Sequence, residues 1–180
     1  AGWKSEEIFA GLPAVLALAT ASGEDLATTS DIVTDAMTAF GLKAEDAGHF
    51  ADVLAQTSRN ANTNVSLLGE SFQYAAPVAG ALGYSVEDVA LALGLMANNG
   101  IKGSQAGTSL RNVFQRMAKP TKESATAMEQ LGISLQDDSG RMYSFGEVMD
   151  QLRRSMGDLA TPSKEVQMQI SDLNTQLEDG

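Results

Sequence analysis

A repeated helix ending constrains the fold of this chain more than any other sequence feature. The segment Phe40–Ala47 recurs 42 residues later as Leu82–Val89. Each copy holds a glycine suited to end a helix, an apolar residue that can pack back onto that helix, and the start of the next helix. The same offset aligns three further pairs of apolar residues: Leu54 with Met96, Leu68 with Leu110, and Phe72 with Phe114. A period of this length, made of two helices, predicts stacked αα-hairpins.

Helix start and stop signals divide the rest of the chain into short segments. Capping residues, glycines and prolines predict about 8 to 10 short helices. Pro13 is expected to start a new helix after a break at Gly11, and Pro77 to kink or divide its helix. The expected helices are residues 5–11, 14–21, 25–40, 44–58, 66–82, 86–99, 106–118, 121–131, 145–159 and 163–177. The predicted fold class is therefore mainly all-α.

One strand signal stands among these helical patterns. Apolar and polar residues alternate at residues 133–135 and again at 141–143, and turn-forming residues lie between them at 137–140. This pattern predicts one small β-hairpin near residues 133–143. Hydrophobic residues make up 43% of the chain but aromatic residues only 6%. That composition favours closely packed helices over a β-sandwich.

The pattern also predicts a domain boundary near residue 160. Residues 1–160 are expected to form a compact helical domain. Pro162 then opens a segment whose apolar residues recur at helical spacing, and residues 161–180 are expected to be the start of a following amphipathic helix. The chain begins with Ala1 and its last helix has no clear cap, so we expect it to be a piece of a longer protein.

The charge and the cysteine content exclude some functional classes. The chain has 23 acidic and 12 basic residues, a net charge of −11. Such a charge disfavours non-specific binding to nucleic acid or to anionic membranes. There is no cysteine, and hence no disulfide framework or thiolate metal site. No run of 18 apolar residues predicts a membrane span.

The candidate site is the glycine-rich stretch Asn98–Arg111 between two apolar helical runs. It contains the glycines Gly100, Gly103 and Gly107, and two cations, Lys102 and Arg111. A phosphate-binding P-loop requires lysine directly after a glycine, whereas here the lysine precedes Gly103. We expect Gly100 to end one helix, Ser104 to cap the next, and the Gly103–Gly107 face to allow close approach of another helix. Partner contact through that face, or an anion at the free N–H groups of the second helix, remain alternatives.

No set of residues predicts catalysis, a metal site or a cofactor. His49 is the only histidine and has no second ligand or nucleophile near it in the sequence. The acidic residues Glu45, Asp46, Glu87 and Asp88 stand in first helical turns, where they are expected as capping residues. Residues 137–140 resemble a calcium loop but lack its later glutamate, so a turn is the better interpretation. The protein is predicted not to be an enzyme.

Several segments resemble the core region of phage tail tape measure proteins. The most specific is Ala97–Arg111, and weaker matches are Asp31–Thr34, Ala39–Leu42, Ala51–Leu54 and Leu131–Ile133. The resemblance implies a structural tail protein that sets tail tube length during assembly and is expelled during genome ejection. It implies no catalytic residues. The implied location is the interior of the virion tail, with the bacterial host cytoplasm during assembly.

The same resemblance implies partners. These are the tail tube and tail assembly chaperone proteins, the baseplate or tail tip proteins, and possible self-association. Specific nucleic-acid binding is not implied, although DNA passes nearby, and contact with the host membrane would involve other regions of the full chain. From another class, the alternative is a helical adaptor that binds a partner helix through the Gly103–Gly107 face. We also expect the isolated domain to be compact and to rearrange inside the tail.

Overall fold

The computed structural model describes residues 4–160, which contain eight α-helices and one short 3-10 helix. No strand occurs in this part of the chain, so the all-α prediction is confirmed. The helices are α1 (Ser5–Ser22), α2 (Leu26–Phe40), η1 (Ala44–Asp46), α3 (Ala47–Asn60), α4 (Val65–Ala81), α5 (Val86–Asn98), α6 (Gly103–Ala118), α7 (Lys122–Gln130) and α8 (Phe145–Ala160).

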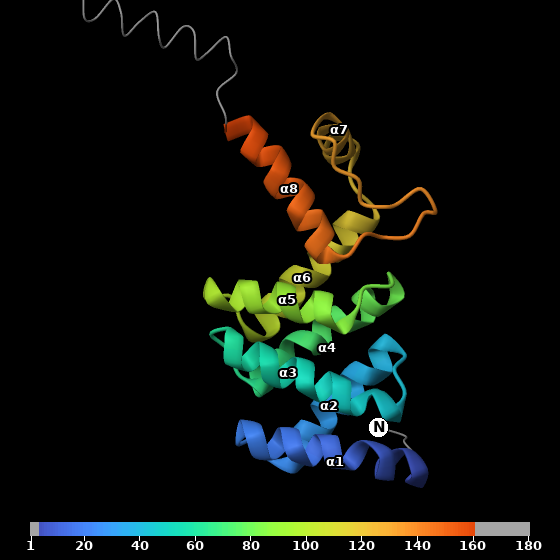
Figure 1. Ribbon diagram of the computed structural model, residues 1–180, viewed down its shortest axis with the longest axis vertical. Helices are drawn as coiled ribbons and strands as arrows, with labels where there is room; N and C mark the ends of the chain where they lie inside the picture. Colours follow the sequence, from blue (N-terminus) through green and yellow to red (C-terminus); the bar gives the residue numbers. More distant parts are fainter. Residues whose placement is uncertain (1–3, 161–180) are drawn as a thin grey trace, which may run out of the picture.

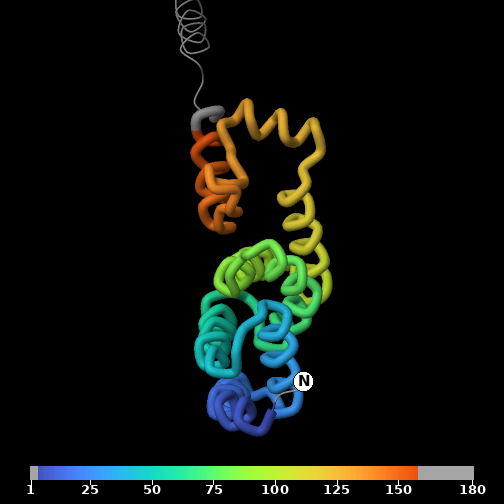
Figure 2. Tube along the Cα trace, turned by 90° about the vertical axis from the view of Figure 1, so that its right-hand side faces the viewer, coloured from blue at the N-terminus to red at the C-terminus, as the bar shows by residue number. Residues whose placement is uncertain are grey.

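The first six α-helices form a stack of two layers. Helices α1, α3 and α5 lie on one another in one layer, and α2, α4 and α6 in the other. Each helix packs mainly against the next helix but one in the chain, which is the arrangement of stacked helical hairpins. Figure 2 shows the two layers side by side, with α1 at one end of the stack and α7 and α8 at the other.

The core is a row of aromatic residues between the two layers. The ring of Phe72 meets the rings of Phe40 and Phe50 edge-on, with centroids 6.1 and 5.5 Å apart. Further along the stack, Tyr84 stacks on Phe114 at 4.4 Å. Phe72 and Phe114, which the 42-residue offset aligns, are both completely buried. The repeat therefore places equivalent aromatic side chains in successive layers of the core.

The repeated helix endings have the same geometry in the two copies. Gly41 and Gly83 both adopt a left-handed backbone, with φ of 66° and 80°. The N–H of the following residue reaches back into the last helical turn in each case: Leu42 donates to the Met37 carbonyl at 2.9 Å, and Tyr84 to the Ala79 carbonyl at 3.0 Å. Only glycine takes this backbone conformation without steric cost, which explains its place in both copies.

Two predicted helix breaks are wrong. Helix α1 runs without interruption through Gly11 and Pro13, and α4 runs through Pro77. A proline inside a helix leaves the carbonyl four residues earlier without a donor. Both prolines lie on exposed faces, and so do Phe9 and Gln73, whose carbonyls are affected. Because water can hydrate those carbonyls, packing of the opposite helix face is enough to keep each helix continuous.

The predicted β-hairpin near residues 133–143 is also wrong. What forms is a single antiparallel bridge between Gln136 and Met142 around a tight turn. On one side of this bridge the N–H of Ser134 donates to the Gln151 side chain at 2.8 Å. On the other side, Ser144 already begins the cap of α8. The chain is thus drawn to α8 on both sides of the turn before a ladder can extend.

The segment after α6 packs more loosely than the stack. Helix α7 has no buried residue, whereas α8 buries Phe145 and Val148 near its start. The N–H of Phe145 donates to Asp88 Oδ1 at 3.0 Å, which joins the start of α8 to α5. The helix expected over residues 163–177 lies outside the described residues. The boundary expected near residue 160 remains a prediction.

Candidate functional site

The turn between α5 and α6 has the conformation expected from its glycine. Gly100 adopts a left-handed φ of 86°. Its N–H donates to the Ala97 carbonyl, and that of Ile101 to the Met96 carbonyl, each at 3.0 Å. Ile101 packs against the core, so the residue after the glycine also anchors the turn. Gly100 therefore ends α5 in the same way as Gly41 and Gly83 end α2 and α4.

Gly103 and Gly107 form the contact surface between α6 and α4. A Cβ atom on Gly107 would overlap the backbone carbonyl of Ser71, so no larger residue fits there without a shift of a helix. The Ser71 hydroxyl lies 2.8 Å from the Gly103 carbonyl and 2.8 Å from the Leu67 carbonyl. The close approach predicted for this face is present within the chain itself. Since α4 covers the face, it cannot serve as a docking site for a partner helix in this conformation.

The start of α6 differs from the expectation. Lys102, and not Ser104, stands at the N-cap position, and Gly103 begins the helix with a left-handed φ of 59°. A carboxylate oxygen of Glu70 lies only 2.5 Å from the position of a Cβ on Gly103. A negative charge thus already stands beside the helix N-terminus, where the helix dipole favours it. This carboxylate disfavours the interpretation of the site as an anion site.

The two cations of the stretch have no ionic partner among residues 4–160. Lys102 and Arg111 are both partly exposed, and none of the three ion pairs in this range includes either of them. Nε of Arg111 is buried without a hydrogen-bond partner in the described structure. These side chains are brought to the same helix but not to a shared site.

Two further glycines serve the same packing purpose and were missed in the sequence. A Cβ on Gly69 would overlap the side chain of Ile32, and one on Gly80 would lie 2.5 Å from the Ala39 carbonyl. Both positions belong to the contact of α4 with α2. Glycines in the interior of an otherwise good helix were the available signal. Close packing against α4 is therefore a property of the whole second layer and not of α6 alone.

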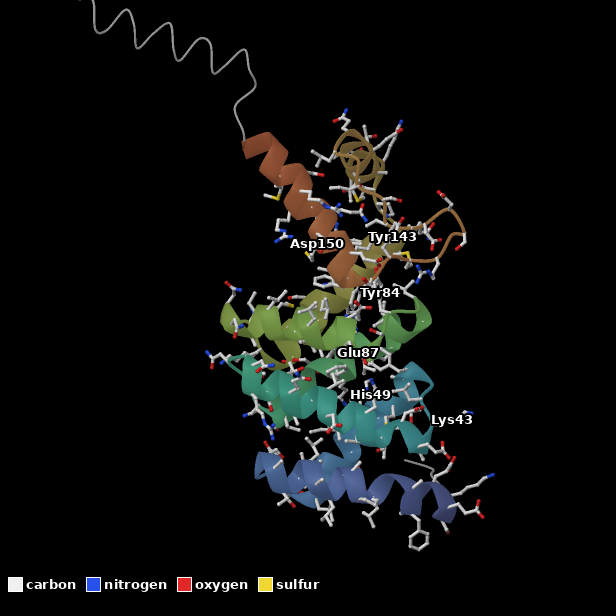
Figure 3. The ribbon with its side chains drawn as sticks, viewed as in Figure 1. Lys43, His49, Tyr84, Glu87, Tyr143 and Asp150 are labelled. Carbon is white, nitrogen blue, oxygen red and sulfur yellow. The ribbon has the colours of Figure 1, made fainter. Side chains whose placement is uncertain are left out.

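The polar groups outside this junction are engaged in local structure. His49 on α3 and Glu87 on α5 form an exposed ion pair that joins the two helices (Figure 3). Partial burial acts to raise the pKa of Glu87, but hydrogen bonds from its own N–H, His49 and Ser85 outweigh it and hold that pKa below its usual value. Asp46 and Asp88 accept hydrogen bonds at the starts of η1 and α5, as predicted.

The acidic turn at residues 137–141 holds itself together. Asp137 Oδ1 accepts hydrogen bonds from the N–H groups of Ser139 and Arg141, and Oδ2 pairs with Arg141 Nε at 3.0 Å. Hydrogen bonds from Ser139 and Arg141 place the pKa of Asp137 far below its usual value. The carboxylate therefore stabilises the turn. Among residues 4–160, no group of three or more possible ligands could hold a metal ion, and no helix is long and apolar enough to span a membrane.

Comparison with known proteins identifies similar sequences. A family described as phage-related minor tail protein matches residues 1–173. The tape measure protein of Pneumococcus phage Dp-1 is 43% identical over 159 residues, which cover 88% of this chain and 14% of that protein. The probable tape measure protein of Escherichia phage P2 is 28% identical over 155 residues, 86% of this chain and 19% of that protein. The chain thus spans less than a fifth of either relative, and no solved structure matches it.

Proposed function

Because this chain belongs to the phage-related minor tail protein family, we propose that it is a structural segment of a tape measure protein. In this proposal the full protein sets the length of the tail tube during assembly and leaves the tail during genome ejection. The observation that carries the proposal is the 43% identity to a named tape measure protein over 88% of the chain. The helical structure, with no metal cluster in its described part, agrees with a structural role.

The stack suggests how such a segment would contribute to a length measurement. Its helices lie across the long axis of the stack (Figure 1). One added layer of helices lengthens such a stack by about 8–10 Å, the usual distance between packed helix axes. The same 42 residues drawn out as one continuous helix would span about 63 Å. Tail length therefore reports whether this region stays folded in the tail.

An in-frame duplication in a phage that encodes this chain tests the proposal. Residues 42–83 form one repeat, bounded by the equivalent glycines Gly41 and Gly83. We expect duplication to lengthen the tail and deletion to shorten it, as measured by electron microscopy of virions. An increase near 63 Å would indicate a rearranged helix, and one near 10 Å a preserved stack. Intact tails of unchanged length in both mutants would contradict the length-setting role.

The partners and the location follow from the same proposal. We expect the chain in the virion tail, and in the host cytoplasm before assembly, with tail tube, chaperone and tail tip proteins as its partners. Affinity capture from infected cells, followed by mass spectrometry, should recover these proteins. A peptidoglycan zymogram tests for wall-degrading activity, and we expect no lysis. The adaptor alternative gains no support, because α4 occupies the Gly103–Gly107 face.

A further inference from the structure

Charge is distributed unevenly along the stack. Residues 4–101 contain 12 acidic and 3 basic side chains, whereas residues 102–160 contain 7 acidic and 8 basic ones. Five of these cations fall between Lys102 and Lys122, a stretch without a single acidic residue. None of the five belongs to an ion pair within the described structure. One end of the molecule is thus strongly acidic, and the other carries uncompensated positive charge.

The acidic end carries an apolar ridge. Phe9, Leu12 and Leu16 recur at spacings of 3 and 4 along α1, and their exposed fractions are 76%, 43% and 51%. No ionisable residue occurs from Ile8 to Ser22. Helix α1 is the end of its layer, with α3 on one side and no helix of the described chain on the other. End helices of stacked repeats are normally polar on their outer face, so an apolar one indicates that something covers it.

The basic end carries an apolar hollow. A space of about 360 Å³ lies between the end of α6, helix α7 and residues 133–136. Its lining is mainly apolar and includes Met117, Ala125, Met128 and Ile133, with Glu129 as the one acidic residue. Lys119 and Lys122 flank the residues that line it. Because α7 buries none of its own residues, the hollow stays unfilled from within the chain.

We propose that these two ends dock to each other between copies of this chain, head to tail. The ridge Phe9–Leu16 of one copy occupies the hollow beneath α7 of the next. Glu6 and Glu7 at the start of α1 then approach Lys119 and Lys122, so that opposite charges meet across the contact. The occupant is a second copy because the same chain carries both complementary surfaces. Since the two surfaces differ, every complex keeps one free ridge and one free hollow and can grow further.

Two single-end variants test this arrangement. Phe9→Glu places a charge on the ridge, and Ala125→Glu places one in the hollow; both residues are exposed, so the fold should be retained. The wild-type 180-residue chain should self-associate with concentration, and each variant alone should associate at least about tenfold more weakly. A 1:1 mixture of the two variants should form a heterodimer and no larger species, because one intact ridge and one intact hollow remain. Sedimentation velocity measures all four samples.

Matched controls separate this contact from other surfaces. Leu95→Glu changes an equally exposed leucine on α5, away from both ends, and should associate as the wild type does. Added salt should weaken the wild-type contact, since opposite charges contribute to it. If circular dichroism shows that one variant is unfolded, Leu16→Glu replaces Phe9→Glu, and the double variant Lys119→Glu/Lys122→Glu replaces Ala125→Glu.

Several outcomes would overturn the proposal. A wild-type chain that stays monomeric at all concentrations contradicts it directly, as does a mixture of folded variants that remains monomeric. Loss of association in Phe9→Glu with full association in Ala125→Glu would indicate a symmetric contact between two α1 helices. Loss of association in Leu95→Glu would move the contact to the groove between α3 and α5.

Discussion

Gly107 and Gly94 are both buried glycines inside helices, but they differ in the space around them. A Cβ on Gly107 would overlap the backbone of Ser71, whereas one on Gly94 would lie 3.5 Å from Ala61 and Thr57, an ordinary contact. We predict that Gly107→Ala lowers the free energy of unfolding by about 1–3 kcal/mol through overpacking. Gly94→Ala should raise it by up to about 1 kcal/mol, because alanine favours the helix. Urea unfolding followed by circular dichroism measures both, and equal effects would contradict the close contact of α4 with α6.

Tyr84 should make stability depend on pH at the alkaline side. Burial, with a smaller effect from the negative charge of Asp88, raises the pKa of Tyr84 to about 12 from the ordinary 10.0. Since the folded pKa exceeds the unfolded one, this stabilisation is complete below pH 10 and is lost as the pH rises towards 12. Thermal unfolding between these values should show a falling melting temperature. The variant Tyr84→Phe should lose less stability over the same interval, and ultraviolet titration should show one fewer late-ionising phenol.

At the scale of the element, one carboxylate joins two helix starts. Asp88 Oδ2 accepts hydrogen bonds from Ser85 at the cap of α5, and Oδ1 accepts one from the N–H of Phe145 at the start of α8. We predict that Asp88→Ala lowers the free energy of unfolding by about 1–3 kcal/mol. Hydrogen exchange in residues 144–157 should become faster, since α8 loses its attachment to α5.

Glu147→Ala is the matched control for that prediction. Glu147 closes only the cap of α8 itself, where its carboxylate accepts the Ser144 N–H at 2.8 Å. Its removal should cost about 0.5–1 kcal/mol and should leave α5 unaffected. If the two variants raised exchange in α8 equally and left α5 equally protected, Asp88 would have no joining role.

The helix ends were predictable from the sequence where local chemistry decides them. The glycine caps at Gly41, Gly83 and Gly100 depend on the backbone of a few neighbouring residues, and the structure confirms all three. Continuity through Pro13 and Pro77 depends on which side of a helix faces solvent, and that is set by distant packing. The hairpin failed for the same reason, because α8 competes for the backbone beside the turn. Local patterns cannot reveal such competition.

The candidate site shows a similar division. The small-residue face at Gly103 and Gly107 was visible as a sequence pattern. Its partner was not, since the contact requires the backbone of Ser71, which lies more than 30 residues away in the chain. Gly69 and Gly80 were overlooked because each is a lone glycine in a helical pattern. Their role appears only when α2 is placed against α4.

At the scale of the whole molecule, the stack should be most stable in its middle. Helices α3 and α4 have helices of their own layer on both sides, whereas α7 buries no residue. We predict that native-state hydrogen exchange is slowest in α3 and α4, faster towards α1, and fastest in α7. Mass spectrometry of peptides from partly exchanged protein measures this gradient. Uniform protection from α1 to α7 would indicate one cooperative unit in place of a stack of semi-independent layers.

The packing of each helix against the next but one has a mechanical consequence. A force that pulls on one end of the chain acts only on the contacts of the outermost hairpin, because no contact joins that hairpin to distant layers. The stack should therefore yield in steps, each of which releases one repeat of 42 residues, or about 140 Å of extended chain. Such a molecule can be threaded through a passage only as wide as a single helix, about 10–12 Å, without its whole core opening at once.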